Sequence, residues 1–124
     1  MLEAAAPLAL EASVAAEPAH DPAAFEALVR EIGQDGAGEV RAVFWNETDA
    51  RLKLFDDLAL AQQRARIERE AHSLKSVART FGYQRLAALA LQLERNVAAL
   101  DEAGYRKLLE AMAAAYAAAR ERDG

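Results

Sequence analysis

The sequence predicts an all-α protein, and three observations lead to that expectation. Alanine (32 residues) and leucine (16 residues) supply most of the hydrophobic side chains of the 124-residue chain, and such side chains lose little rotamer freedom in a helix. Apolar residues recur at helical spacing through five segments. Proline occurs only three times, never after Pro22. We expect an up-and-down antiparallel four-helix bundle with a short additional N-terminal helix.

The chain is expected to divide into a flexible N-terminal tail at residues 1–20 and one helical domain at residues 21–124. Pro7 and Pro18 interrupt the alanine-rich beginning, which has no sustained apolar stripe. Asp21 and Pro22 are typical of a helix N-cap followed by proline at the first helical position. A short first helix is therefore predicted from Pro22 to Gly33, where glycine ends the apolar run.

A second, longer helix is predicted after a turn at residues 34–38, and it should run to about Leu60. Its expected buried stripe consists of Val40, Val43, Phe44, Leu52, Phe55 and Leu58. The boundary with the third helix is expected at residues 61–63. This stretch contains no glycine or proline, so the sequence defines the position of this boundary less sharply than that of the others.

Three more helices follow from alternating steps of three and four residues. The third carries Ile67, Ala71, Leu74, Ala78 and Phe81, and Gly82 ends it. The fourth carries Leu86, Leu89, Leu93, Val97 and Leu100. Asp101 should cap the fifth, with Tyr105, Leu108, Leu109, Met112, Tyr116 and Ala119 on its inner face. The loops between these helices are short, so neighbouring helices should pack antiparallel.

Composition limits the classes of function. The chain has no cysteine, which excludes disulfides, thiolate metal sites and a cysteine nucleophile, and we expect no cofactor and no metal. A net charge of −5 argues against nucleic-acid binding. The absence of a basic signal-like start and of a long apolar segment predicts a cytoplasmic protein without a membrane span. We further expect a monomer.

Charge is unevenly distributed along the chain. Between residues 62 and 80 there are five basic and two acidic residues, so this stretch carries +3 and the remainder carries −8. A local basic face on an acidic protein suggests an acidic partner. An ordinary solvated helix face is the alternative interpretation of the same charges.

The candidate chemistry lies on the third helix, at Ala71-His72-Ser73-Leu74-Lys75-Ser76. Because Ala71 belongs to the buried stripe, His72 should lie on the flank or outside of the bundle, open to solvent. A surface imidazole is largely neutral at cellular pH and can attack phosphorus. Lys75, three residues later, lies on the same face and can offset phosphoryl charge. Ser76 is small enough to let another protein approach.

The segment AHSLKSVARTFGY, from Ala71 to Tyr83, resembles the signature of histidine phosphotransfer (HPt) domains of multistep phosphorelays. That signature is histidine, two residues, lysine, a small residue and then a glycine that ends the helix. Leu86 and the pair Leu93-Glu94 fall where the next helix of such domains has leucine and leucine-glutamate. The resemblance covers residues 44–94. Ser76 stands where glycine is commonest in the family, a departure that concerns transfer rate more than acceptor identity.

The resemblance implies a phosphocarrier rather than an enzyme with its own ATP-binding or independent catalytic domain. His72 would accept a phosphoryl group from the aspartyl phosphate of a receiver domain and pass it to another response-regulator receiver. The partners implied are receivers, a hybrid histidine kinase or both. Lys75 would stabilise phosphate charge, and the expected partner contacts are Arg69, Ser76, Arg79 and Glu94. Glu94 would orient either a partner or the histidine from the neighbouring helix, and a solvated glutamate without a role is the alternative.

Two alternatives use the same bundle. A pseudo-HPt or adaptor domain would bind a signalling protein without phosphotransfer, but the retention of both His72 and Lys75 favours a carrier. The dimerisation hairpin of a sensor kinase usually has an acidic residue directly after its histidine and a proline nearby. Here Ser73 follows His72, and no proline occurs after Pro22, so this second alternative fits poorly.

Overall fold

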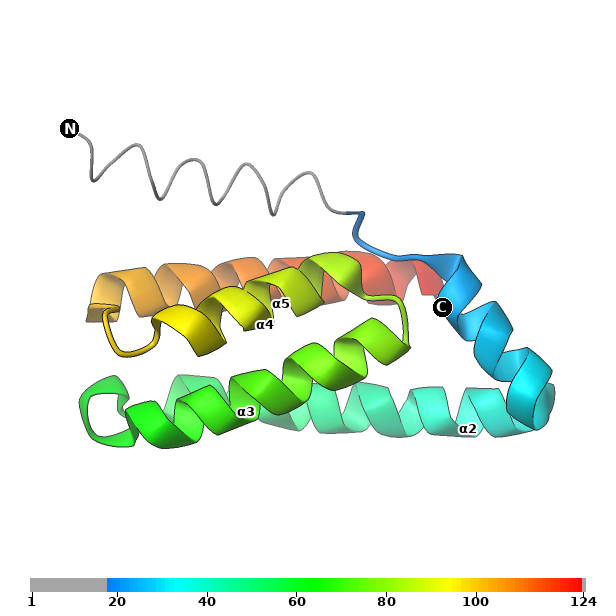
Figure 1. The fold of residues 1–124 in the computed structure, drawn as a ribbon, viewed down its shortest axis with the longest axis horizontal. Coiled ribbons are helices and arrows are strands. Elements are labelled where there is room, and N and C mark those ends of the chain that lie inside the picture. Colours follow the sequence, from blue (N-terminus) through cyan, green and yellow to red (C-terminus); the bar gives the residue numbers. More distant parts are fainter. Residues whose placement is uncertain (1–17, 124) are drawn as a thin grey trace.

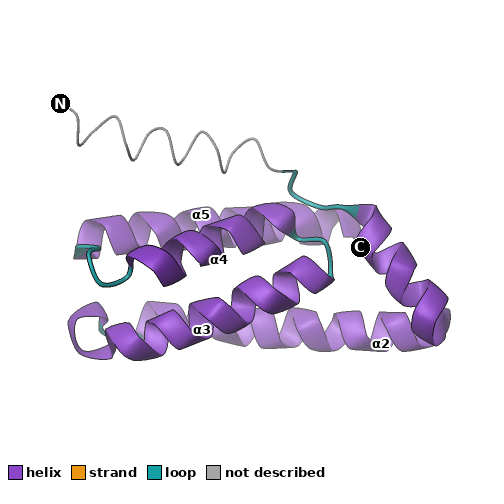
Figure 2. Ribbon diagram, viewed as in Figure 1, coloured by secondary structure: helices purple, strands orange, loops and turns teal. Residues whose placement is uncertain are grey.

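The computed structural model describes residues 18–123, and within them the chain forms four helices and no strand. These are α2 (Pro22–Asp57), α3 (Leu60–Thr80), α4 (Gln84–Asn96) and α5 (Glu102–Asp123). The prediction of an all-helical protein is confirmed. Consecutive long helices run in opposite directions across the view of Figure 1, and only short loops join them (Figure 2).

The first predicted helix is continuous with α2 and is set off from it by a bend. Asp21 caps its start, because the Asp21 side chain accepts a hydrogen bond from the Ala23 amide at 3.1 Å. Gly33 has φ 86° and ψ 166°, a conformation that glycine adopts far more readily than other residues. The segment before Gly33 therefore lies across one end of the bundle (Figure 1). The turn predicted at residues 34–38 is wrong: these residues are helical, since one glycine suffices to change direction.

The boundary between α2 and α3 lies a few residues earlier than the sequence predicts. Leu58 and Ala59 adopt extended backbone conformations, with ψ 131° and 116°. This short extended connection turns both Leu58 and Leu60 into the core. Hydrophobic burial, rather than a glycine or proline, therefore fixes the boundary.

The buried face of α2 differs in part from the predicted stripe. Phe44, Phe55 and Leu58 are buried as expected. Val40 and Val43 are exposed, so their assignment to the core is wrong. They lie on a flank of α2 that the other described helices leave exposed. The fully buried α2 positions that the pattern did not include are Ala37 and Thr48.

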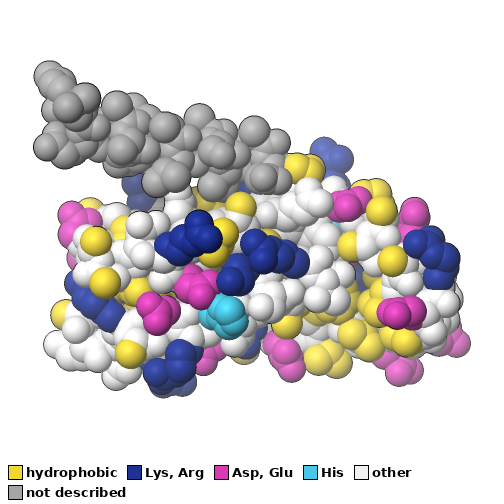
Figure 3. All heavy atoms as spheres, viewed as in Figure 1, with side chains coloured by type: hydrophobic (Ala, Val, Ile, Leu, Met, Phe, Trp, Pro, Cys, Tyr) yellow, Lys and Arg dark blue, Asp and Glu magenta, His cyan; other side chains and the backbone are white. Residues whose placement is uncertain are grey.

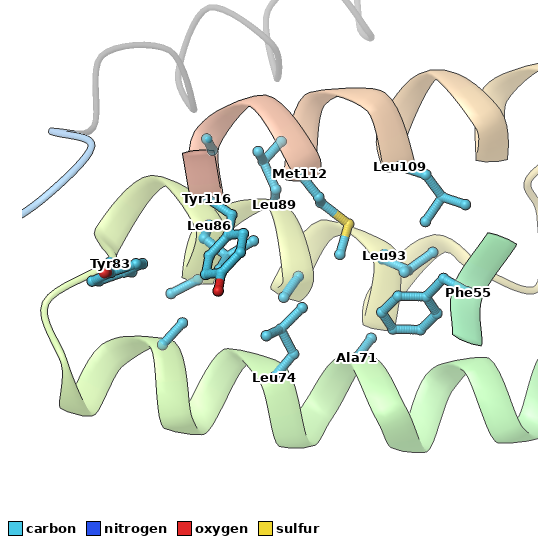
Figure 4. Packing of buried hydrophobic residues seen from close by; sticks show 14 of the residues in the cluster. Phe55, Ala71, Leu74, Tyr83, Leu86, Leu89, Leu93, Leu109, Met112 and Tyr116 are labelled. Atoms are coloured by element: carbon cyan, nitrogen blue, oxygen red, sulfur yellow. The ribbon is translucent and has the colours of Figure 1, made fainter. Parts of the chain in front are cut away.

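The core between α3, α4 and α5 follows the predicted stripes closely, except that α4 ends at Asn96, so Val97 and Leu100 lie beyond the helix that was expected to carry them. On α3 the buried side chains are Ile67, Ala71, Leu74 and Ala78, with Phe81 just beyond its end. Leucines of α4 and the Leu109, Met112 and Tyr116 side chains of α5 fill the space opposite (Figure 4). Tyr105 is also buried and donates a hydrogen bond to the Phe55 carbonyl at 2.9 Å. Burial raises the pKa of Tyr105 to about 12, so this phenol keeps its donor proton at neutral pH.

Gly82 has a second structural role besides ending α3. Its φ is 79°, and a Cβ atom at this position would overlap the Asp21 carbonyl oxygen and lie 2.9 Å from the Ala24 Cβ. The Asp21 amide donates to the Gly82 carbonyl at 2.7 Å. Glycine at position 82 thus lets the N-terminal segment dock against the turn between α3 and α4.

Residues 1–17 of the predicted tail lie outside the described part of the chain. Residues 18–20 lie against the bundle: the Arg85 amide donates to the Pro18 carbonyl at 3.1 Å, and the His20 side chain is 7% exposed.

Candidate functional site

His72 lies on the outer flank of α3, where its side chain is 59% exposed. Its neighbours Ala71 and Leu74 are fully buried, so they anchor this turn of α3 in the core. Figure 3 shows one histidine side chain on this face of the molecule, next to acidic and basic side chains. The predicted placement on the flank or outside of the bundle therefore matches the geometry.

Glu94, on α4, reaches across to the imidazole of His72. Its Oε2 atom lies 2.8 Å from His72 Nδ1, and its Oε1 atom accepts a hydrogen bond from Lys75 Nζ at 2.9 Å. Lys75 Nζ is also 3.4 Å from His72 Nδ1. One carboxylate thus joins the two α3 side chains into a cluster of three groups, the His72–Lys75–Glu94 cluster.

Lys75 and His72 stabilise the negative charge of Glu94. The hydrogen bond from Lys75, and after it the one from His72, lower the pKa of the Glu94 carboxyl below its ordinary value. Glu94 is therefore ionised at neutral pH and acts as an acceptor only. An acceptor at Nδ1 favours the imidazole form with its proton on that nitrogen.

The other ring nitrogen of His72, Nε2, makes no hydrogen bond with any residue between 18 and 123. In the form with a proton on Nδ1, Nε2 carries the free electron pair. The cluster can therefore present a nucleophilic nitrogen to a molecule that approaches from solvent.

Lys75 is more enclosed than its position on an outer face suggested, since its side chain is only 13% exposed. The sequence placed Lys75 beside His72, and the 3.4 Å separation agrees with that placement. The pairing with Glu94 depends on how α3 and α4 pack, which the spacing along one helix does not contain.

The remaining predicted site residues surround His72 on α3. Ser76 is exposed, and its hydroxyl donates to the His72 carbonyl oxygen at 3.2 Å. Arg69 and Arg79 are exposed, and neither forms an ion pair with another described residue. Both guanidinium groups are free to meet an anionic partner.

A second cluster of polar groups, missed by the sequence analysis, lies at the end of the bundle. Asp123 Oδ1 is 3.3 Å from His20 Nε2 and 3.1 Å from Arg41 Nη1. Tyr83 donates to Asp123 Oδ2 at 3.0 Å and accepts from Trp45 Nε1 at 2.7 Å. The sequence analysis gave His20 no role. No local pattern could have paired residues about a hundred positions apart.

No group of three or more histidine, aspartate or glutamate side chains within residues 18–123 is arranged to hold a metal ion. Over the same residues, no helix is both long and apolar enough to cross a membrane.

Comparison with known families adds one finding. The family model described as "Hpt domain" matches residues 39–122, a range that contains the whole His72–Lys75–Glu94 cluster. No curated protein and no solved structure matches the chain significantly.

Proposed function

Because the chain belongs to the Hpt domain family, whose general function is histidine phosphotransfer in two-component phosphorelays, we propose that this protein is a phosphocarrier that uses His72 as its acceptor. The phosphoryl group arrives from the aspartyl phosphate of a receiver domain and leaves to another response-regulator receiver. The observation that carries this proposal is the exposed imidazole whose Nδ1 is engaged by Glu94 while Nε2 stays open.

The proposed transfer is a single displacement at phosphorus. The electron pair of His72 Nε2 attacks the phosphorus atom, a P–N bond forms, and the bond between phosphorus and the receiver's aspartate oxygen breaks. The electron pair of that bond stays on the aspartate as carboxylate. The ring gains positive charge while Nδ1 keeps its proton, and the Glu94 carboxylate at 2.8 Å stabilises that charge. Transfer to the second receiver reverses these steps.

Lys75 serves this step in two ways. Its ammonium group holds Glu94 in place at 2.9 Å, and it brings positive charge to within 3.4 Å of the imidazole. Positive charge there offsets the negative charge of the phosphoryl group during transfer. The enclosed position of Lys75 strengthens this effect, because a charge is screened less by solvent when it is partly buried.

The surface around His72 is proposed to bind the partner. Arg69 and Arg79 attract the acidic surroundings of a receiver's phosphorylated aspartate, Ser76 leaves room for the approach, and Glu94 borders the contact. The partners are receivers of response regulators, of a hybrid histidine kinase or of both. The carrier is proposed to act as a cytoplasmic monomer on an up-and-down bundle scaffold, without catalytic activity of its own.

The test is incubation with phosphorylated receivers, followed by mass-spectrometric location of the phosphoryl group. We expect one phosphoryl group, on His72, lost in acid and retained in mild base, since a phosphoramidate has that stability and a serine ester does not. Addition of a second receiver should remove it. Acid-stable label would contradict the proposal. A receiver that binds tightly and never transfers would favour the adaptor alternative.

A further inference from the structure

Residues 18–32, which we call the N-terminal arm, are joined to the remainder of α2 through Gly33. The backbone is helical on both sides of this glycine, and Gly33 is the one residue within α2 that has non-helical dihedral angles. Its φ of 86° and ψ of 166° lie in a region of backbone conformations that is essentially restricted to glycine. The bend that lays the arm across the end of the bundle (Figure 1) therefore depends on one residue.

The space around Gly33 is open, so packing does not hold the bend in place. A Cβ atom built on this residue would meet no atom within 4 Å. If Gly33 took helical dihedral angles, α2 would become one straight helix of 36 residues, about 54 Å long. The arm would then leave its own bundle. The main cost of straightening is the loss of the contacts between the arm and the bundle.

Backbone contacts fix the arm to the turn between α3 and α4. The Asp21 amide donates to the Gly82 carbonyl at 2.7 Å, and the Arg85 amide donates to the Pro18 carbonyl at 3.1 Å. Because Gly82 has no side chain, the Asp21 carbonyl and the Ala24 methyl group can approach its α-carbon closely. These contacts are directional and tight, so they select the backbone path of the arm itself.

Side chains of the arm complete the docking. The His20 ring meets the Tyr83 ring edge-on, with centroids 5.4 Å apart, and His20 Nε2 lies 3.3 Å from Asp123 Oδ1. The Arg41 guanidinium lies 4.2 Å from the centroid of the Phe25 ring. The groups that receive the arm, which we call the arm site, are Arg41, Gly82, Tyr83, Arg85 and Asp123. All of them follow Gly33 in the chain, so a bundle whose own arm has left still carries the whole site.

From this arrangement we propose that the arm site also accepts the N-terminal arm of a second copy of this chain, so that two copies exchange arms when Gly33 straightens. The exchanged arm makes the contacts that it makes within one chain, because the occupant is identical. Only the hinge changes conformation, and such an exchange is a low-cost route to a dimer. Within one chain the effective concentration of the arm is about millimolar or higher, so the monomer prevails in dilute solution.

The exchange leaves the His72–Lys75–Glu94 cluster outside the new contacts. His72 precedes Gly82 by ten residues, about 15 Å along the axis of α3, and the arm site lies at the end of the bundle. The exchanged dimer therefore presents two exposed imidazoles. A carrier with two acceptors can engage two linked receivers at once, a consequence that, unlike the exchange itself, rests on the proposed phosphocarrier function.

The test is Gly33→Ala, with molar mass measured by sedimentation velocity over a range of concentrations. Alanine makes the bent conformation costly and favours the straight helix. We expect about a tenfold shift per chain, and thus a dimerisation constant raised by about 100-fold, because two hinges straighten in each dimer. Gly38→Ala is the matched control. It adds the same methyl group in open space, at a helical glycine without a positive φ, and should stay as monomeric as wild type.

Two further measurements distinguish an exchanged dimer from any other. In the Gly33→Ala dimer, the Asp21 and Arg85 amides should stay protected from hydrogen exchange, because the other copy supplies their acceptors. Adding His20→Ala removes a contact of the arm that occurs twice in each dimer. The double variant should therefore have a dimerisation constant about tenfold lower than that of Gly33→Ala.

Four results would each overturn the inference. A Gly33→Ala variant that stays monomeric would show that arms are not exchanged. Unprotected Asp21 and Arg85 amides in the dimer, or a dimer that His20→Ala leaves equally tight, would show association through another surface. Equal dimerisation of Gly38→Ala would show that the hinge is not the cause. Loss of the helical circular-dichroism signal in Gly33→Ala would show that the bundle cannot release its arm and remain folded.

Discussion

The described part of the chain contains two histidines, and each faces a carboxylate in a different environment. His72 lies 2.8 Å from Glu94 with a side chain that is 59% exposed. His20 lies 3.3 Å from Asp123 with a side chain that is 7% exposed, and its ring is nearly perpendicular to the Tyr83 ring. The chemical groups are the same, and burial decides which imidazole a partner can reach.

The hydrogen-bonding groups around the two carboxylates also differ in their structural roles. Arg41 and Tyr83 both bond to Asp123, and together with Trp45 they join the N-terminal segment, α2, the turn after α3 and the end of α5. A buried carboxylate requires such partners, because an unpaired charge in the interior is costly. At Glu94, Lys75 takes one oxygen and His72 takes the other, and Nε2 of the ring stays open. The first cluster connects elements, and the second holds an exposed imidazole with its Nε2 atom open to solvent.

The largest expected difference between the two histidines is in phosphoryl acceptance. His72→Gln should abolish acid-labile labelling by receivers, because glutamine has no nucleophilic ring nitrogen. His20→Gln should leave labelling at the wild-type level. Radiolabel or mass-spectrometric counts on both variants check this, and any label that persists in His72→Gln would show a different acceptor.

The two carboxylates should differ in their effect on transfer rate. Glu94→Gln keeps the side-chain size but removes the charge proposed to stabilise the ring cation. Loss of such a supporting group typically lowers activity by about 10-fold to 100-fold, and we expect a decrease of this size in the transfer rate. Asp123→Asn should transfer at close to the wild-type rate. Rapid-quench kinetics with one receiver measure both, and equal rates for Glu94→Gln and wild type would remove Glu94 from the mechanism.

The free energy of unfolding should show the opposite order, with Asp123→Asn the more strongly affected variant. Asp123→Asn leaves the partly buried Arg41 without its charged partner, and we expect a loss of about 1–3 kcal/mol in the free energy of unfolding. Glu94→Gln should have a smaller effect, because the Glu94 side chain is 22% exposed and that of Asp123 is 5% exposed, so solvent can replace more of the contacts that Glu94 loses. Urea unfolding followed by circular dichroism compares the two. If Glu94→Gln proves the more destabilising variant, the division between a structural and a functional cluster is wrong.

The smallest effect concerns acid pH. Lys75, followed by His72, lowers the pKa of Glu94 in the folded chain, so the folded state binds its proton less readily than the unfolded state. The resulting stability is present above the unfolded pKa of glutamate, about 4.3, and is lost as pH falls through the lower folded value. Below pH 5, Glu94→Gln should show a slightly flatter decline in stability than wild type. Parallel declines would mean that the ion pair adds nothing.

Features that depend on spacing within one helix could be predicted from the sequence. The stripes of α3 and α4 were predicted because residues three and four apart share a face. The same rule placed His72 beside Lys75 and put both near the surface. Glu94 was expected to orient either a partner or the histidine, and only the packing of α3 against α4 shows its contact with the imidazole.

Features that depend on the packing of one helix against another became visible only in the folded chain. The crossing of α3 and α4 brings Glu94 to 2.8 Å from His72 and encloses Lys75. The packing of α2 leaves Val40 and Val43 uncovered, although their periodicity matched that of core residues. The Asp123 cluster joins segments about a hundred residues apart. Periodicity fixes the direction of a side chain on its own helix, whereas the distance to another helix depends on side-chain packing between both.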